Sequence, residues 1–165
     1  SSAGSGAGVT WFAGSGAPIE SSENGERVFL YQRGITQSLS LFFKVPQSYV
    51  SGRQLQMIFG VYSPATSGTV LMQAVSTLVR KNTDSVDSTS LAHTKTLADG
   101  SGSGTITNTT ANQMRLAILD ITDSSGQIAA TSISAGDLIK IKLQRGTDTD
   151  TEDTRFIPTF TEFTV

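Results

Sequence analysis

One stretch near the C-terminus, residues 137–145 (DLIKIKLQR), constrains the fold more than any other feature of this sequence. Its aliphatic residues alternate strictly with lysines: Ile139, Lys140, Ile141, Lys142 and Leu143. Because successive side chains of a β-strand point to opposite faces of the sheet, this period of two predicts a strand with one buried and one solvated face.

Comparable runs, separated by Gly, Pro, Asn and Asp turn signals, occur upstream of this stretch. We expect strands at residues 27–31, 37–45, 54–63, 69–80, 92–97, 114–121 and 127–133. The run at 69–80 (TVLMQAVSTLVR) fits a helix about as well as a strand, and its β-branched content and bounding turns favour a strand. No segment shows a clear helical stripe. The pattern predicts an all-β fold, a jelly-roll-like antiparallel β-sandwich of about eight strands.

The last apolar run follows Arg155, contains Phe156, Phe160 and Phe163, and completes this set of strands. Its phenylalanines do not keep one phase, because Pro158 interrupts the alternation. Proline donates no hydrogen bond to a sheet and is confined to bulges, strand starts and edge strands. We therefore expect either a β-bulge or an edge position at Pro158.

The first 26 residues differ in composition from the rest of the chain. Tracts such as SSAGSGAG bury too little surface to offset the entropy lost on ordering. We therefore expect a flexible Gly/Ser/Ala-rich N-terminal arm at residues 1–26 and a β-sandwich domain at 27–165. Trp11 and Phe12 interrupt the tracts and are candidates for docking on a partner. They either pack back on the domain or anchor the arm in a neighbouring subunit.

Composition excludes several classes of protein. Twelve Lys and Arg residues against 14 Asp and Glu residues give a net charge of −2, which argues against a nucleic-acid-binding protein with a basic stripe. The absence of cysteine excludes disulfides and thiolate metal sites. The apolar runs are shorter than the ~20 residues that a membrane-spanning helix requires, so we expect no membrane partner.

The sequence offers little for catalysis. Its single histidine, His93, lies in a Ser/Thr-rich segment, and no serine lies in a G-x-S-x-G elbow. The glycine tracts lack the Lys-Ser/Thr pair of a phosphate-binding loop. The carboxylates outside the last loop lie in turns, without aromatic neighbours that would raise a pKa: Asp84, Asp87, Asp120 and Asp123. We therefore expect no enzymatic activity and no cofactor.

An acidic loop joins the last two strands and lies between Arg145 and Arg155. Its carboxylates are Asp148, Asp150, Glu152 and Asp153. Clustered carboxylates are calcium ligands, but this loop lacks the glycine and the ligand spacing of an EF-hand. We expect a solvated structural loop, partly neutralised by the two arginines, and keep a calcium site as the alternative.

Glycan-binding sandwiches present surface aromatic residues beside hydrogen-bonding groups. The candidates here are Trp11, Tyr31, Tyr49 and Tyr62. The polar loops within residues 81–110 are further candidates, because loops of this length are commonly functional or mobile.

Several strand-and-turn phrases resemble those of tailed-bacteriophage virion surface proteins. They are F-K-V-P from Phe43, Y-S-P from Tyr62, I-T-D-S-S-G-Q from Ile121, A-G-D-L-I-K-I-K-L from Ala135 and D-T-R-F-I-P from Asp153. The resemblance covers residues 41–165 and carries no catalytic motif.

This resemblance implies a β-sandwich domain of the capsid decoration, head-fibre or tail-fibre type. It further implies a non-enzymatic structural protein, located on the virion and docked on other virion proteins such as the major capsid protein. By analogy we expect a homo-oligomer, with a trimer favoured. The alternative function is a receptor- or carbohydrate-binding β-sandwich module that contacts a host surface glycan.

Overall fold

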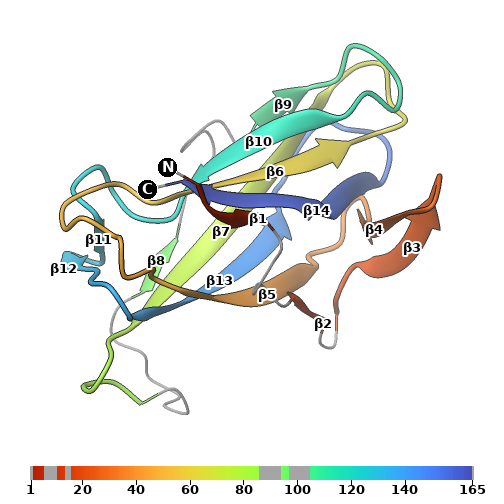
Figure 1. The fold of residues 1–165 in the computed structure, drawn as a ribbon. Coiled ribbons are helices and arrows are strands. Elements are labelled where there is room, and N and C mark those ends of the chain that lie inside the picture. Colours follow the sequence, from red (N-terminus) through yellow and green to blue (C-terminus); the bar gives the residue numbers. More distant parts are fainter. Residues whose placement is uncertain (1, 6–10, 14–15, 86–93, 97–104, 165) are drawn as a thin grey trace.

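The structure, a computed structural model, describes residues 2–5, 11–13, 16–85, 94–96 and 105–164. Two antiparallel β-sheets pack face to face in this part of the chain (Figure 1). The described residues contain no α-helix, and hence no helix that could cross a membrane. The predicted all-β sandwich is confirmed.

Each sheet has five strands in its main path and one additional strand. The first sheet has the order β10 (Arg115–Asp120), β6 (Gln56–Tyr62), β14 (Thr154–Thr164), β4 (Glu26–Tyr31) and β3 (Ile19–Glu23), with β1 (Ser2–Ser5) paired to β14. The second has the order β2 (Trp11–Ala13), β5 (Ser38–Lys44), β13 (Leu138–Arg145), β7 (Thr69–Val79) and β8 (Thr94–Thr96), with β9 (Thr105–Thr107) paired to β7. A separate hairpin consists of β11 (Gln127–Ile128) and β12 (Thr131–Ser132).

Eight of these strands form a jelly roll. The set β4-β14-β6-β10 faces the set β5-β13-β7-β8, so the chain crosses repeatedly from one sheet to the other. This order is that of two interlocked Greek keys. The last two strands, β13 and β14, have neighbours on both sides in their sheets, so the C-terminal stretch forms the centre of the sandwich.

The core fills the space between the two sheets. Along β13 the buried residues Ile139, Ile141 and Leu143 alternate with partly exposed ones, as the sequence pattern predicts. Phe43 of β5 stacks on Phe163 of β14, with ring centroids 4.1 Å apart, and so joins the two sheets. Each fully buried side chain of this size contributes about 1.5–3 kcal/mol to stability.

Pro158 lies in a β-bulge, one of the two predicted alternatives. The register between β14 and β6 shifts between Ile157 and Glu162, and pairing resumes beyond the shift. On the other side of β14, pairing with β4 ends at Phe156 and pairing with β1 begins at Glu162, so no strand pairs with Pro158 on that side either. Thr159 and Phe160, inside the bulge, are exposed.

Residues 127–133 form a tight hairpin, so the prediction of one strand there is wrong. β11 and β12 pair across a two-residue turn at Ala129 and Ala130, whose φ angles are 49° and 62°. Positive φ at both central residues is the geometry of hairpin turns, which glycine and asparagine adopt far more readily than alanine. The sequence therefore carried no turn signal at this point.

The N-terminal segment contains strands that pair with the sandwich. Glu23 of β3 lies opposite Glu26 of β4, so the expected division after residue 26 falls within a hairpin. Backbone hydrogen bonds join strands whatever their side chains, which is why small and polar residues pair with sheet strands here. Trp11 and Phe12 lie in β2, opposite Leu41 and Ser40 of β5.

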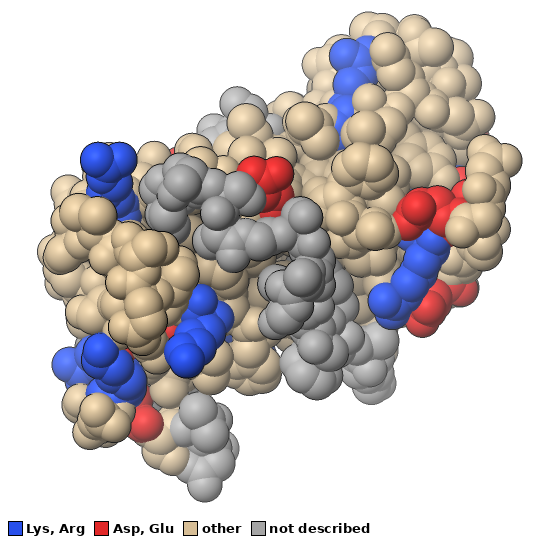
Figure 2. Space-filling view, viewed as in Figure 1, with Lys and Arg blue, Asp and Glu red and all other residues tan. Residues whose placement is uncertain are grey.

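The surface carries both signs of charge. On the face shown in Figure 2, basic and acidic side chains lie in small groups, some of them side by side, between uncharged residues. No continuous basic stripe crosses the part of this face that the structure describes.

Candidate functional site

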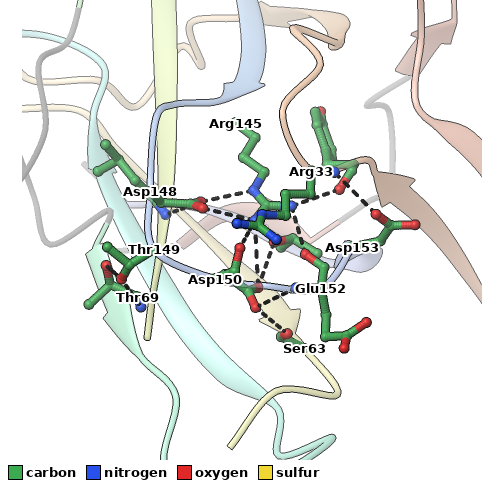
Figure 3. A network of polar contacts seen from close by, with 12 residues as sticks. Arg33, Ser63, Thr69, Arg145, Asp148, Thr149, Asp150, Glu152 and Asp153 are labelled. Atoms are coloured by element: carbon green, nitrogen blue, oxygen red, sulfur yellow. Dashed lines mark hydrogen bonds and ion pairs between the residues drawn. The ribbon is translucent and has the colours of Figure 1, made fainter. Parts of the chain in front are cut away.

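The predicted acidic loop forms a buried ion-pair network around Arg145, the last residue of β13 (Figure 3). The side chains of Arg145 and Asp148 are each 3% exposed. Arg145 donates from Nε and Nη2 to the two carboxylate oxygens of Asp148, both at 2.8 Å. This bidentate geometry is the strongest form of the arginine–carboxylate pair.

Asp150 is completely buried and also lies in this network. Its carboxylate accepts hydrogen bonds from Ser63 Oγ at 3.0 Å, from the Glu152 amide at 3.1 Å and from Thr154 Oγ1 at 3.3 Å. The guanidinium of Arg145 lies 3.8 Å from the same carboxylate. Arg145 also donates to three backbone carbonyls, those of Tyr31, Asp150 and Glu152.

The prediction of a solvated loop is wrong for Asp148 and Asp150. A carboxylate is buried only when hydrogen bonds and an opposite charge compensate for its lost hydration. The guanidinium of Arg145 provides both. Glu152 is exposed, and Asp153 accepts from the Arg33 amide at 3.1 Å. Arg155, the second expected partner, binds the Asp153 carbonyl through Nη1.

The carboxylates of the network are occupied by donors of the protein itself. The oxygens of Asp148 and Asp150 already accept bonds from protein donors. Among the residues that the structure describes, no three His, Asp or Glu side chains are grouped as metal ligands. His93 and Asp87 lie outside the described residues, as do 86–93 and 97–104 of the polar loops.

The three tyrosines proposed for glycan binding have different environments. Tyr31 is fully buried, and its hydroxyl donates to the Leu143 carbonyl at 2.9 Å. Tyr49 is 8% exposed and donates to the Arg53 carbonyl at 2.7 Å. Burial raises the pKa of Tyr31 well above its usual value and also raises the pKa of Tyr49. Only Tyr62 is partly exposed beside an open cleft.

This cleft, which we call the Tyr62 cleft, lies on the outer face of the first sheet and has a volume of about 700 Å³. It is lined by Glu23, Asn24, Glu26, Val28, Tyr62, Pro64, Asn112, Met114, Arg155 and Ile157. Six of them lie in strands β3, β4, β6 and β14, and Asn24, Pro64, Asn112 and Met114 lie in the loops beside these strands. Asn24 and Gly25 have φ angles of 51° and 78°, so a tight hairpin turn places Glu23 and Glu26 on adjacent strands at the rim.

Three side chains of the cleft hold one another in place. Arg155 Nε donates to Glu23 Oε1 at 3.1 Å, and the Tyr62 hydroxyl donates to Glu23 Oε2. In β14, Arg155 lies directly opposite Tyr62 of β6. Because each partner is fixed by a charged hydrogen bond, the cleft presents its polar groups in a defined arrangement.

The same contacts set the protonation states at neutral pH. The hydrogen bond from Tyr62, together with Arg155, lowers the pKa of Glu23 in spite of its partial burial. Burial, and then the hydrogen bond to Glu23 and its charge, raise the pKa of Tyr62 from 10.0 to about 12. Glu23 is therefore an ionised acceptor, and Tyr62 a neutral aromatic ring.

A second groove, of about 440 Å³, lies between the 32–36 loop and the end of β13. Arg145 and Asp148 are among its lining residues and are bonded to each other. No aromatic side chain lines it. The Tyr62 cleft is therefore the better candidate for ligand binding.

Sequence reasoning identified Tyr62 but missed its partners. Glu23 lies in the segment expected to be a flexible arm, 132 positions from Arg155 in the sequence. Arg155 was expected to neutralise the acidic loop. No local pattern connects two residues at this separation, so only the pairing of the strands reveals the site.

Comparisons with known proteins give no family. No protein-family model and no curated protein sequence matches the chain. Among solved structures, it is similar to the enzymatically active domain of tailspike protein 4 from bacteriophage CBA120, with a TM-score of 0.40 and 12% identity over 94% of this chain and 17% of that chain. It is also similar to TmCBM61, solved in complex with β-1,4-galactotriose, with a TM-score of 0.40 and 9% identity over 99% of this chain and 85% of that chain. Likenesses this distant assign neither an activity nor a ligand to this chain.

Proposed function

We propose that this chain is a non-enzymatic jelly-roll module that binds a carbohydrate in the Tyr62 cleft. The observation that carries the proposal is a partly exposed aromatic ring, Tyr62, held beside an ionised carboxylate and a guanidinium. A sugar ring offers an apolar C–H face to an aromatic ring and hydroxyls to polar groups. Binding sites of this kind combine apolar area with a few well-placed polar side chains.

The mixture of charges in the cleft favours a neutral polyol. A hydroxyl is both a donor and an acceptor, so it can donate to Glu23 and accept from Arg155 at the same time. An anionic ligand would meet Glu23 and Glu26 at the rim, and a cationic one would meet Arg155. Arg155 uses Nε and Nη1 in the bonds to Glu23 and the Asp153 carbonyl, and a guanidinium carries further N–H donors.

The cleft lacks the protonation pattern of a glycoside hydrolase. Such enzymes require a carboxylic acid with a raised pKa that protonates the leaving oxygen. The pKa of Glu23 is lowered instead, so it carries no proton at neutral pH. Glu26, the other carboxylate of the cleft, accepts a hydrogen bond from Thr159 Oγ1. This arrangement supports binding without hydrolysis.

The resemblance of residues 41–165 to tailed-phage proteins supports a place on the virion surface. There the module would be a homotrimeric part of a capsid decoration, head fibre or tail fibre, attached to other virion proteins and exposed to host glycans. The strand β2, which contains Trp11 and Phe12, is at the end of the second sheet and offers a position for docking. Light scattering at high concentration tests the assembly, and a strict monomer would contradict it.

A glycan array probed with the full chain, followed by calorimetry on the glycans that bind, tests the cleft. We expect Tyr62→Ala to weaken binding about tenfold, corresponding to about 1.4 kcal/mol, because both the ring and the bond to Glu23 are lost. Glu23→Gln should weaken binding as well, since the ionised acceptor is removed. Lys142→Ala, on the outer face of the other sheet, is the control and should bind normally. No bound glycan, or unchanged affinity in Tyr62→Ala, would refute the proposal.

A further inference from the structure

An apolar surface lies beside the Tyr62 cleft on the same sheet. It surrounds Gly60 of β6, and three of its side chains are strongly exposed: Met114 by 42%, Leu116 by 58% and Phe160 by 50%. Ile157 completes it and is buried. We call these five residues the Gly60 platform.

Gly60 forms the floor of the platform. It pairs with Leu116 of β10 on one side and with Ile157 of β14 on the other. A Cβ atom at Gly60 would lie 3.2 Å from Phe160 Cβ and 3.4 Å from Met114 Sδ. Gly60 itself is buried, so the missing side chain lets Phe160 and Met114 lie directly against the backbone of β6.

The β-bulge of β14 presents Phe160 to solvent. The register shift between Ile157 and Glu162 interrupts the alternation, so Phe160 is exposed although Phe156 and Phe163 are buried. A hydrogen bond from Thr159 Oγ1 to Glu26 ties the bulge to the rim of the Tyr62 cleft. Phe160, Met114 and Leu116 together make an exposed apolar surface, and surfaces of this kind commonly mark interaction sites.

The platform and the cleft are continuous. Met114 and Ile157 belong to both. Tyr62 and Gly60 are two positions apart on β6, which corresponds to about 7 Å along a strand. Residues two apart on a strand have their side chains on the same face, so the two surfaces adjoin.

We propose that the Gly60 platform is a second subsite, which receives the apolar C–H face of a pyranose next to the sugar held at Tyr62. The inference rests on the proposed function and specifies its ligand: an unbranched glycan of at least two linked pyranoses, rather than a single sugar. The polar rim formed by Glu26, Thr159 and Asn112 favours this occupant over an apolar protein surface, because the hydroxyls of the sugar would meet hydrogen-bonding groups there.

Calorimetry with matched probes tests the subsite. The probes are the mono-, di- and trisaccharides of β-1,4-linked glucose, galactose and N-acetylglucosamine, titrated into the full chain. We expect at least one trisaccharide to bind about tenfold more tightly than its monosaccharide. Phe160→Ala should abolish most of this gain and leave monosaccharide affinity within about twofold, whereas Tyr62→Ala should weaken the monosaccharide itself. Val50→Ala, which removes an equally exposed aliphatic side chain elsewhere, is the control.

The outcomes separate the two proposals. Monosaccharide binding with no gain for longer probes, or a gain that survives Phe160→Ala, overturns the subsite and leaves the Tyr62 cleft intact. Failure of all probes to bind contradicts both. If Phe160→Ala changes the oligomeric state by light scattering while sugar affinities stay the same, the platform is a contact between protein chains and the subsite is overturned.

Discussion

Arg145→Met is the change that most directly tests the buried network. Within the described part of the chain, it removes the one positive charge paired with Asp148 and Asp150, whose side chains are 3% and 0% exposed. It also removes the donors to the carbonyls of Tyr31, Asp150 and Glu152. Methionine fills much of the same volume, so the loss reports on charge and hydrogen bonding rather than on a cavity.

The expected loss follows from the cost of an uncompensated buried charge. Removing one partner of a buried ion pair costs about 3–5 kcal/mol. For a chain of this size, 1 kcal/mol corresponds to about 2–4 °C in Tm, so we expect Tm to fall by about 6–20 °C. Arg145→Lys keeps the charge but not the bidentate fork, and should give an intermediate loss.

Thermal and urea denaturation followed by circular dichroism measure these losses. Arg27→Met is the matched control, because the ion pair of Arg27 with Glu20 has side chains 50% and 57% exposed. An exposed pair contributes at most about 1 kcal/mol. A fall in Tm of less than about 3 °C for Arg145→Met, or an equal fall for Arg27→Met, would refute the reasoning.

Two further predictions concern glycine geometry and pH. In urea denaturation, Gly68→Ala should reduce the free energy of unfolding by at least about 1 kcal/mol more than Gly25→Ala does. Both glycines have positive φ, but a Cβ at Gly68 would clash, 2.5 Å from the Thr149 carbonyl oxygen, whereas a Cβ at Gly25 would have no neighbour within 4 Å. Equal losses for the two variants would contradict this reasoning. The raised pKa of Tyr62, about 12 against 10.0, means that the folded state keeps a proton that the unfolded state loses. Its contribution to stability is therefore complete below pH 10 and is lost as pH rises to 12. Tyr62→Phe should reduce this alkaline loss of stability and remove one phenolate from the absorbance titration, and an unchanged alkaline profile would contradict the assignment.

The strands were predictable because their signal is local. Alternation along residues 137–145 depends only on near neighbours in sequence, and it corresponds directly to the buried and exposed faces of β13. The bulge at Pro158 was predictable for the same reason, since proline itself cannot donate to the ladder. The turn at Ala129 and Ala130 was not, because positive φ at alanine follows from its surroundings and leaves no mark in the sequence.

The site was predictable only in part. The sequence offered Tyr31, Tyr49 and Tyr62 as equal candidates, and tertiary structure alone buried the first two and left Tyr62 beside a cleft. Its partners Glu23 and Arg155 are 132 positions apart and meet because β3, β4, β14 and β6 belong to one sheet.

The C-terminal stretch shows the same division. By itself the sequence determined that residues 137–145 form a half-buried strand of an all-β sandwich, because side-chain alternation is a property of the local backbone. Only the tertiary structure decided that the acids that follow are buried, because burial of a carboxylate depends on a compensating partner. Arg145 folds back over Asp148 and Asp150, while Ser63 and Thr154 arrive from β6–β7 and β14 to complete their hydrogen bonds.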